Sequence, residues 1–587
     1  MTRRRVLFVL MVALSVIGTT SLLAQFLSVG GWSLSEMIAL AAFVVVMPWL
    51  AVGFCNAAIG LVLELFARNP LRSTNPMAVG VDLDSRLEAS TALLLCIRNE
   101  MPARLVRNLD ALARGLMASP DADRFHVYVL SDTTDPQIAE QEVVAFEQLG
   151  QSWQSKLALT YRRRTDNQGF KAGNIRDFCE RWGTQYEFAV VLDADSLMSA
   201  QAVRRLVLTM QANPKLGILQ GLVVGLPSAS AFTRLFQFGM RLGMRSYTLG
   251  SAWWQGDCGP YWGHNAVLRL APFILECELP VFVERNGKQT HILSHDQVEA
   301  VLMRRAGYEV RVYPFEDESY EENPPNLIDF VIRDLRWCAG NMQYWRLLGL
   351  PGLKVTSRVQ LVLAMLMFVG APAWIVLLSS LGWSVRHWTP AQASNAHVLI
   401  AVFGMVILMA ALPKLATSVS VLFRARERRS FGGACRFSLG VVAETIFSML
   451  ITPVLWVSQT IALTGMLFGK RITWAAQNRD EQQLSWHSAT RAFGLHTVVG
   501  LILGWLWIDM QVPATWWIAY FLAGLWVSIP FAVLTSWPPL GHWLAHWRLA
   551  STPQELGADG FLSGVQGYSP ALADTAVSSV TSLEGGQ

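Results

Sequence analysis

Long stretches of the chain carry almost no charged residues. Between Arg5 and Arg68, for example, the only charged residues are Glu36 and Glu64. A charged side chain near the centre of a bilayer costs several kcal/mol, and a helical span needs about 20 apolar residues. The pattern predicts membrane spans near residues 6–28, 38–63, 359–382, 397–423, 491–511 and 515–536. The apolar stretch 437–469 fits one long span, a hairpin or a re-entrant segment.

Basic residues at the ends of these stretches predict their orientation. Arg3–Arg5, Arg68 and the cluster Arg424–Arg429 mark the cytoplasmic side, because Lys and Arg are enriched in cytoplasmic loops. Residues 69–357 are then cytoplasmic. The basic residues within 470–490 place that segment on the same side, which a simple crossing by the preceding stretch would not allow. The first apolar stretch is similar to a signal peptide, but no small-x-small cleavage site follows it, so we favour an uncleaved anchor.

Short apolar runs alternate with helical stretches within residues 85–350. The runs are 91–97, 126–130 and 188–192, and the helical stretches include 102–117 and 199–212. This alternation is typical of βαβ units in a Rossmann-like sheet. Ligands bind beyond the carboxyl ends of such strands, and polar residues follow each run there, among them Glu100, Asp132 and Asp193.

The composition excludes several classes of protein. Charged residues make up only 15% of the chain and hydrophobic residues 52%, whereas a typical soluble domain has about 25% charged residues. The composition therefore indicates a membrane protein with a folded polar part. A net charge of +4 is too small to indicate nucleic-acid binding. The seven cysteines form no CxxC pair, so neither a zinc knuckle nor a disulfide scaffold is indicated.

The chain divides into four predicted regions. They are N-terminal transmembrane helices (1–68), a folded polar domain (69–357), a C-terminal transmembrane domain with an interfacial segment at 424–490 (358–545), and a tail (546–587). From residue 551 onward the tail has no Lys or Arg and is rich in Gly, Ser and Ala. We expect it to be disordered and cytoplasmic.

Asp193-Ala194-Asp195, at the end of a predicted strand, is the central chemical signal. Alternation along an extended chain would direct the two carboxylates to opposite faces, but a turn at the strand end lets both approach one cation. Carboxylate oxygens suit Mg²⁺ or Mn²⁺, which keep water ligands and share phosphate oxygens. Turns and helix caps also favour Asp, so this motif alone leaves both interpretations open.

Positive charge precedes a helix predicted over 174–182. The basic run Tyr161–Arg164 and the segment Lys171–Asn174 supply it. A Lys beside a helix N-terminus can bind phosphate. A solvated basic surface is the alternative.

The segment His291–Asp296 allows three interpretations. His291 and His295 have the spacing of a zinc pair, but no third ligand is evident. Asp296 could act as a general base near metal and substrate, which we favour. A helix N-cap at Ser294 or Asp296, before the apolar-periodic stretch 297–303, is the third interpretation. Farther on, Trp337 offers a flat face for a sugar ring and Arg336 a fork for diphosphate oxygens, although alone they fit an ordinary amphipathic helix end.

Taken in order, these motifs resemble those of the membrane-embedded processive family 2 glycosyltransferases, the class of cellulose and hyaluronan synthases. The matching residues are Asp132, Lys171–Asn174, Asp193–Asp195, Ser294–Asp296 and Arg333–Trp337. Further segments resemble the osmoregulated periplasmic glucan synthases of Gram-negative bacteria, namely 130–136, 173–179, 261–266 and 292–296. The resemblance implies a GT-A-like catalytic domain with a mixed, Rossmann-like sheet, joined to an α-helical transmembrane domain. It extends from about residue 90 into the later spans.

The resemblance also implies an activity and a site. A glucosyltransferase of this kind transfers glucose from UDP-glucose, with inversion, to a growing β-glucan that is β-1,2-linked in this subfamily. Asp132 would hold the uracil, Lys171 the diphosphate and Asp296 the acceptor proton, while Asp193 would lie near the nucleotide. Mg²⁺ (or Mn²⁺) would bind Asp195 and His295. The other expected substrate contacts are Glu100, Asn174, Gly263, His264, Asn265, Arg333, Arg336 and Trp337.

Location and partners follow from the same resemblance. We expect a multi-pass protein of the bacterial inner membrane, in contact with its lipid, with the catalytic domain in the cytoplasm. Acyl carrier protein and a periplasmic glucan-processing protein are expected partners, and nucleic acid is not. Lys470–Trp474 resembles a gating loop. The best-known members carry long cytoplasmic extensions that have no counterpart in this sequence, so we expect regulatory contacts through them to be absent.

Two alternatives remain at this stage. The first is another processive synthase, cellulose-like or hyaluronan-like, with a different linkage or donor. Arg333, at a position where cellulose synthases have Gln, and the Gly-His-Asn segment argue against it. The second is a glycan transporter or scaffold with a degenerate transferase domain. The intact carboxylates argue against that.

Overall fold

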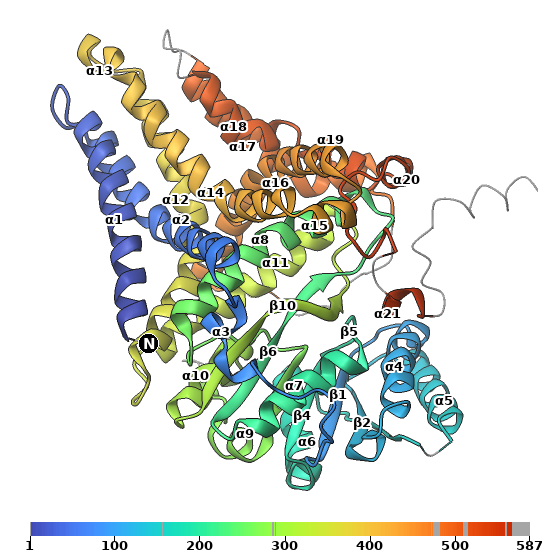
Figure 1. Ribbon diagram of the computed structural model, residues 1–587. Coiled ribbons are helices and arrows are strands. Elements are labelled where there is room, and N and C mark those ends of the chain that lie inside the picture. Colours follow the sequence, from blue (N-terminus) through green and yellow to red (C-terminus); the bar gives the residue numbers. More distant parts are fainter. Residues whose placement is uncertain are drawn as a thin grey trace, which may run out of the picture.

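A computed structural model describes residues 2–154, 156–283, 287, 289–470, 472, 482–508, 515–557 and 560–565. An α/β domain lies on one side of a group of long apolar helices (Figure 1). Among the described helices, six are long and apolar enough to cross a membrane. They are α1 (Thr2–Leu27), α2 (Leu34–Phe66), α12 (Val355–Val385), α14 (Ala396–Phe423), α16 (Ala434–Leu467) and α17 (Trp486–Ile508).

The span predicted over 515–536 is broken in two. α18 (Thr515–Trp526) and α19 (Ser528–Thr535) meet at an angle of 65°. Pro530 explains the break, because proline has no N–H to donate and its ring clashes with the carbonyl four residues earlier, that of Trp526. The pair forms either a broken span or a re-entrant segment.

A single helix, α16, covers the ambiguous stretch 437–469 up to Leu467. This helix packs along two helices attached to the α/β domain, α8 (Ala231–Gln255) and α11 (Leu327–Met342). Successive contacts are Phe238–Phe437 and Phe232–Phe447, with ring centres 5.9 and 5.2 Å apart. Farther along, Gln459 reaches α11. α16 therefore follows the α/β domain from Phe437 to Gln459.

The α/β domain is built on an eight-stranded mixed sheet with the order β3-β2-β1-β4-β7-β6-β10-β5. The strands are β1 (Thr91–Ile97), β2 (Phe125–Ser131), β3 (Ala158–Arg163), β4 (Phe188–Asp193), β5 (Leu197–Met198), β6 (Leu216–Gly225), β7 (Ala266–Arg269) and β10 (Glu309–Glu321). β1 to β4 are parallel, whereas β7 runs antiparallel to both β4 and β6. The predicted GT-A-like, Rossmann-like mixed sheet is confirmed.

Helices cover both faces of the sheet, which explains why the central strands are apolar throughout. One face packs on α4 (Pro102–Met117), α5 (Pro136–Ser152) and α7 (Ala200–Ala212). The other packs on α6 (Phe170–Trp182), α9 (Leu270–Glu276) and α10 (Asp296–Arg305). Shorter elements are α3 (Pro70–Thr74), α13 (Pro390–Ser394), α15 (Ala425–Ser430), α20 (Pro538–His546), α21 (Gly560–Ser563), β8 (Phe282–Val283) and β9 (Gln289–Thr290).

The first part of the tail is ordered, which corrects the prediction of disorder from residue 546. Glu555 forms a buried ion pair with Arg234 of α8. Leu562 of α21 packs on Leu197 and Val224, near α4 and β5 (Figure 1). Composition gave no sign of these contacts, because they depend on partners far away in the sequence. The tail residues 566–587 and most of the expected gating loop at 470–474 lie outside the described residues.

Candidate active site

The Lys171 ammonium joins segments from three parts of the sheet edge. Its Nζ donates to Asp193 Oδ1 at the end of β4 and to the carbonyl oxygen of Gly263, 2.7 Å away. α6 begins at Phe170, earlier than predicted, so Lys171 lies in its first turn, where the helix dipole favours anions. Burial alone would lower the pKa of Lys171, but the Asp193 carboxylate raises it above its ordinary value. The site therefore holds a fixed positive charge.

A bidentate ion pair orders the turn that leads into α6. Asp132 follows β2 and is 4% exposed, and Arg164 donates to its two carboxylate oxygens at 2.5 and 2.8 Å. Arg164 also donates to the carbonyl oxygens of Gln168 (3.1 Å) and Phe170 (2.7 Å). The turn needs a glycine at Gly173, since a Cβ there would lie 2.0 Å from the Gln168 oxygen.

The Asn174 side chain forms its hydrogen bonds inside the protein, so the prediction that it contacts substrate is corrected. Its Nδ2 donates to the Leu130 carbonyl oxygen at 2.8 Å, and its Oδ1 accepts from Arg162 at 2.6 Å. The residue is only 1% exposed. Both polar ends of the amide are therefore used where α6 packs on β2 and β3. Arg162 is buried too, so this part of the basic run is no solvated surface.

Asp193 and Asp195 occupy a tight turn after β4. The Asp193 N–H donates to Ser196 Oγ at 2.9 Å, and the Ser196 N–H donates to the Asp193 carbonyl oxygen at 3.0 Å. Asp195 is 8% exposed. The turn breaks the strand alternation and places both residues at the sheet edge, and their binding of one cation stays a prediction.

Asp296 begins α10. The N-cap residue is His295, whose side chain makes no capping hydrogen bond, so the helix-cap interpretation of Ser294 or Asp296 is wrong. No described residue donates a hydrogen bond to the Asp296 carboxylate. Gly263, at φ +87°, packs against this residue, because a Cβ on the glycine would lie 3.4 Å from Asp296 Cβ. The loop that accepts from Lys171 thus also contacts Asp296.

His295 pairs through one ring nitrogen with a carboxylate of its own helix. Its Nδ1 lies 2.9 Å from Glu299 Oε2, and both side chains are buried. Burial alone would lower the pKa of His295, but the Glu299 carboxylate raises it above its ordinary value. Within the described part of the chain, His295 Nε2 forms no hydrogen bond.

A buried amide fixes the loop between α8 and β7. Gln220 in β6 accepts from the Trp262 N–H (2.8 Å) and donates to the His264 carbonyl oxygen (2.9 Å). Asn265 is fully buried and donates to Ser319 Oγ at 2.9 Å, so it anchors the loop, which corrects its expected contact with substrate. Sequence reasoning missed Gln220, although an amide within an apolar strand was an available signal.

Glu321 is a further carboxylate that sequence reasoning missed. It ends β10, and its Oε2 lies 3.4 Å from His264 Nε2. Burial raises the pKa of Glu321, and the charges of Asp195 and Asp193 add to that increase. Its position at a strand end was the only signal in the sequence, because β10 is charged and irregular.

The motif on α11 presents one exposed ring. The Arg333 guanidinium lies 4.9 Å from the centre of the Trp337 ring and 5.7 Å from those of Phe330 and Phe236. Trp337 is 45% exposed, whereas Arg333 and Arg336 are 8% and 6% exposed. Arg333 therefore supports an open aromatic face.

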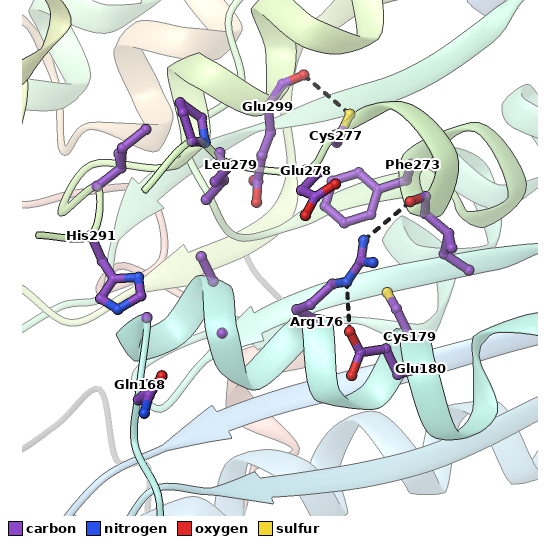
Figure 2. A pocket seen from close by; sticks show the side chains of 16 residues that line it. Gln168, Arg176, Cys179, Glu180, Phe273, Cys277, Glu278, Leu279, His291 and Glu299 are labelled. Atoms are coloured by element: carbon purple, nitrogen blue, oxygen red, sulfur yellow. Dashed lines mark hydrogen bonds and ion pairs between the residues drawn. The ribbon is translucent and has the colours of Figure 1, made fainter. Parts of the chain in front are cut away.

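A cavity of about 250 Å³ lies between α6, α9 and α10 (Figure 2). His291 and Glu299 lie on its wall. Arg176 crosses it and donates to Glu180 (2.9 Å) and to the Ile274 carbonyl oxygen (3.1 Å). Glu299, on the cavity wall, also pairs with His295, the residue before Asp296.

The four predicted carboxylates share one edge of the sheet. Cys96 in β1 pairs in register with Asp193 of β4, and burial raises its pKa to about 12. Asp296 lies next to this group because Gly263, which packs against Asp296, also accepts a hydrogen bond from Lys171. The geometry thus combines a fixed cation, two nearby carboxylates and a third carboxylate, Asp296, that accepts no hydrogen bond from the part of the chain that the structure describes.

Comparisons with known proteins agree with this geometry. Residues 93–274 match the model of glycosyl transferase family 2, and residues 188–414 match that of glycosyl transferase family group 2. A glucans biosynthesis glucosyltransferase H of Xanthomonas campestris pv. campestris (strain B100) is 36% identical over 547 residues, covering 90% of this chain and 83% of the relative. The protein of that name from Xylella fastidiosa (strain 9a5c) is 33% identical over 559 residues, 92% of this chain and 86% of the relative. The chain therefore belongs to the glucans biosynthesis glucosyltransferase H family and is a family 2 glucosyltransferase of osmoregulated glucan synthesis.

Proposed function

We propose that this enzyme transfers glucose from UDP-glucose, with inversion and processively, to a growing β-1,2-linked glucan. One observation carries the proposal. The Gly263 loop contacts both Lys171, a fixed cation suited to diphosphate, and Asp296, a carboxylate with no partner among the described residues. Donor and acceptor chemistry can therefore meet at one place.

Donor binding uses the two ion pairs. Arg164 holds the Asp132 carboxylate in one orientation, and the remaining lone pairs accept the uracil N–H. Lys171, in the first turn of α6, binds the diphosphate with the helix N-terminus. Glu100, which follows β1 at the same edge, completes the nucleotide site.

The expected metal ligands suit Mg²⁺ or Mn²⁺. Asp195 supplies hard carboxylate oxygens, and His295 Nε2 has no hydrogen-bond partner among the described residues. The described residues contain no group of three or more potential ligands at one point. That pattern suits an ion that takes its other ligands from substrate phosphate and water. When bound, the ion would neutralise the leaving diphosphate.

Asp296 acts as the general base. Its carboxylate takes the proton from an acceptor hydroxyl, whose oxygen attacks the anomeric carbon opposite the diphosphate and so inverts the α-linked donor to a β-linkage. Trp337 stacks on the terminal acceptor sugar, and Arg336 binds diphosphate. Gly263 and His264 line the acceptor site.

The proposal extends to location and partners. The basic flanks support a catalytic domain in the cytoplasm and spans in the inner membrane, through which the glucan leaves. The resemblance supports acyl carrier protein and a periplasmic glucan-processing protein as partners.

Purified enzyme in lipid nanodiscs, given labelled UDP-glucose and Mg²⁺, tests the function. We expect a β-linked glucose polymer, and linkage analysis distinguishes β-1,2-glucan from cellulose-like products. If the enzyme neither hydrolyses UDP-glucose nor transfers glucose from it, the proposal is overturned.

A further inference from the structure

Glu321 occupies a central position that no recognised motif covers. The Leu226 N–H donates to the Glu321 carbonyl oxygen at 2.8 Å, which fixes the end of β10 against the end of β6. Strand alternation then separates Glu321 from its neighbour. Glu322 points the other way and pairs with Arg104 (3.0 Å) and Arg107 (3.5 Å) on α4.

The Glu321 side chain interacts with residues of both the proposed donor site and the proposed acceptor site. On one side it meets His264 Nε2 at 3.4 Å, in the loop that contacts Asp296. The charge of Arg333, which stacks on Trp337, also acts on it, as do those of Asp193 and Asp195. Glu321 therefore pairs with the loop beside Asp296 and lies within range of the charges of Asp193, Asp195 and Arg333.

The Glu321 carboxylate is not saturated. It accepts no hydrogen bond from any described residue, and its side chain is 18% exposed. A carboxylate has about four acceptor positions and no donor when ionised, and it suits neighbouring hydroxyl groups. Charge-assisted bonds of this kind are about twice as strong as neutral ones.

We propose that Glu321, with His264, accepts hydrogen bonds from ring hydroxyls of the acceptor glucose and thereby decides which hydroxyl faces Asp296. Glu321 is a specificity-determining residue of the glucosyl transfer, and this role rests on the proposed function. Trp337 fixes the plane of the sugar, which leaves rotation within that plane free. A hydroxyl contact at Glu321 removes that freedom.

The test compares Glu321→Gln with wild type in nanodiscs. UDP binding and hydrolysis of UDP-glucose by water should stay within about twofold, because neither needs the acceptor. The acceptor KM should rise about tenfold or more, since a site built to bind a hydroxyl loses much when the contact is lost. Linkage analysis should show mixed products. Glu322→Gln is the matched control, with the same chemical change on the opposite side of the strand, and should keep the wild-type linkage and acceptor KM.

Three outcomes would overturn the inference. An unchanged acceptor KM with uniform linkage would show that Glu321 does not bind the acceptor. An increased Mg²⁺ requirement would make it a metal ligand, and lost UDP binding or a lower melting temperature would make its role structural. His264→Gln measures the contribution of His264 apart from that of Glu321, and it should also raise the acceptor KM. If the wild-type enzyme does not use UDP-glucose at all, the proposed function itself is overturned, and with it the role of Glu321.

Discussion

Lys171 and Asp193 form an ion pair in which the same ammonium also donates to the Gly263 carbonyl oxygen, 2.7 Å away. The pair therefore connects the first turn of α6, the end of β4 and the loop beside Asp296. Its electrostatics match an anionic donor, because the ammonium is held charged where the helix dipole is also positive.

Replacing Lys171 by Met should weaken UDP binding by about tenfold or more, since it removes a partly buried charge from the diphosphate site. Isothermal titration of UDP into detergent-solubilised enzyme measures the effect. Arg176→Met is the control, because Arg176 lies on the cavity side of the same helix and pairs with Glu180. Equal losses in the two variants would contradict a specific role for Lys171.

Asp296→Asn should lower glucan synthesis by about 10²- to 10⁴-fold and leave UDP affinity unchanged, because only proton transfer is lost. Radiolabelled polymer formation and UDP titration measure the two quantities. Asp123→Asn removes an exposed carboxylate, 60% accessible, and should change neither. Normal polymer formation by Asp296→Asn would exclude the residue as the base.

The sequence predicted the central strands and several helices closely. The predicted stretches 91–97 and 102–117 coincide with β1 and α4. A continuous apolar run bounded by polar residues specifies a buried parallel strand, and Pro102 at the helix start specifies the beginning of α4. Local chemistry was sufficient at these positions.

Tertiary contacts explain what the sequence did not predict. β10 carries charges at alternating and irregular positions, because its later part borders the active site, so Glu321 gave no periodic signal. The amides of Asn174 and Asn265 match family motifs, yet the structure uses them internally. A motif shows which residue types gather at a site, whereas the direction of each side chain depends on its neighbours.

Asp334 predicts a pH effect on stability. It accepts from Gln459 of α16 at 2.7 Å, and burial raises the pKa of its carboxyl to about 6. A carboxyl whose pKa is raised in the folded state contributes stability at low pH that is lost as the pH rises through that value. Asp334→Asn should therefore stabilise the enzyme by about 2–3 kcal/mol at pH 7.5 and by roughly half as much at pH 5, because the unfolded carboxyl already ionises below that pH. Melting temperatures at the two pH values measure this. An equal gain at both would show that ionisation is not the cause.

The buried pair Arg234–Glu555 connects the tail to α8, and it should make the tail necessary for stability. The two side chains are 5% and 7% exposed, and Gln554 contacts Arg241 two turns along the same helix. Truncation after residue 549 would leave the Arg234 charge buried without Glu555, which costs about 3–5 kcal/mol. We expect a lower melting temperature and loss of glucan synthesis.

The double variant Arg234→Met, Glu555→Leu is the informative control. Replacing both charges by apolar groups of similar size removes the unpaired charge, so it should melt close to wild type, whereas Glu555→Leu alone should be strongly destabilised. The free energy of coupling follows from the double-mutant cycle. If Glu555→Leu and the double variant melt alike, the tail does not depend on this ion pair, and its contribution would have to come from Leu562 and its apolar contacts.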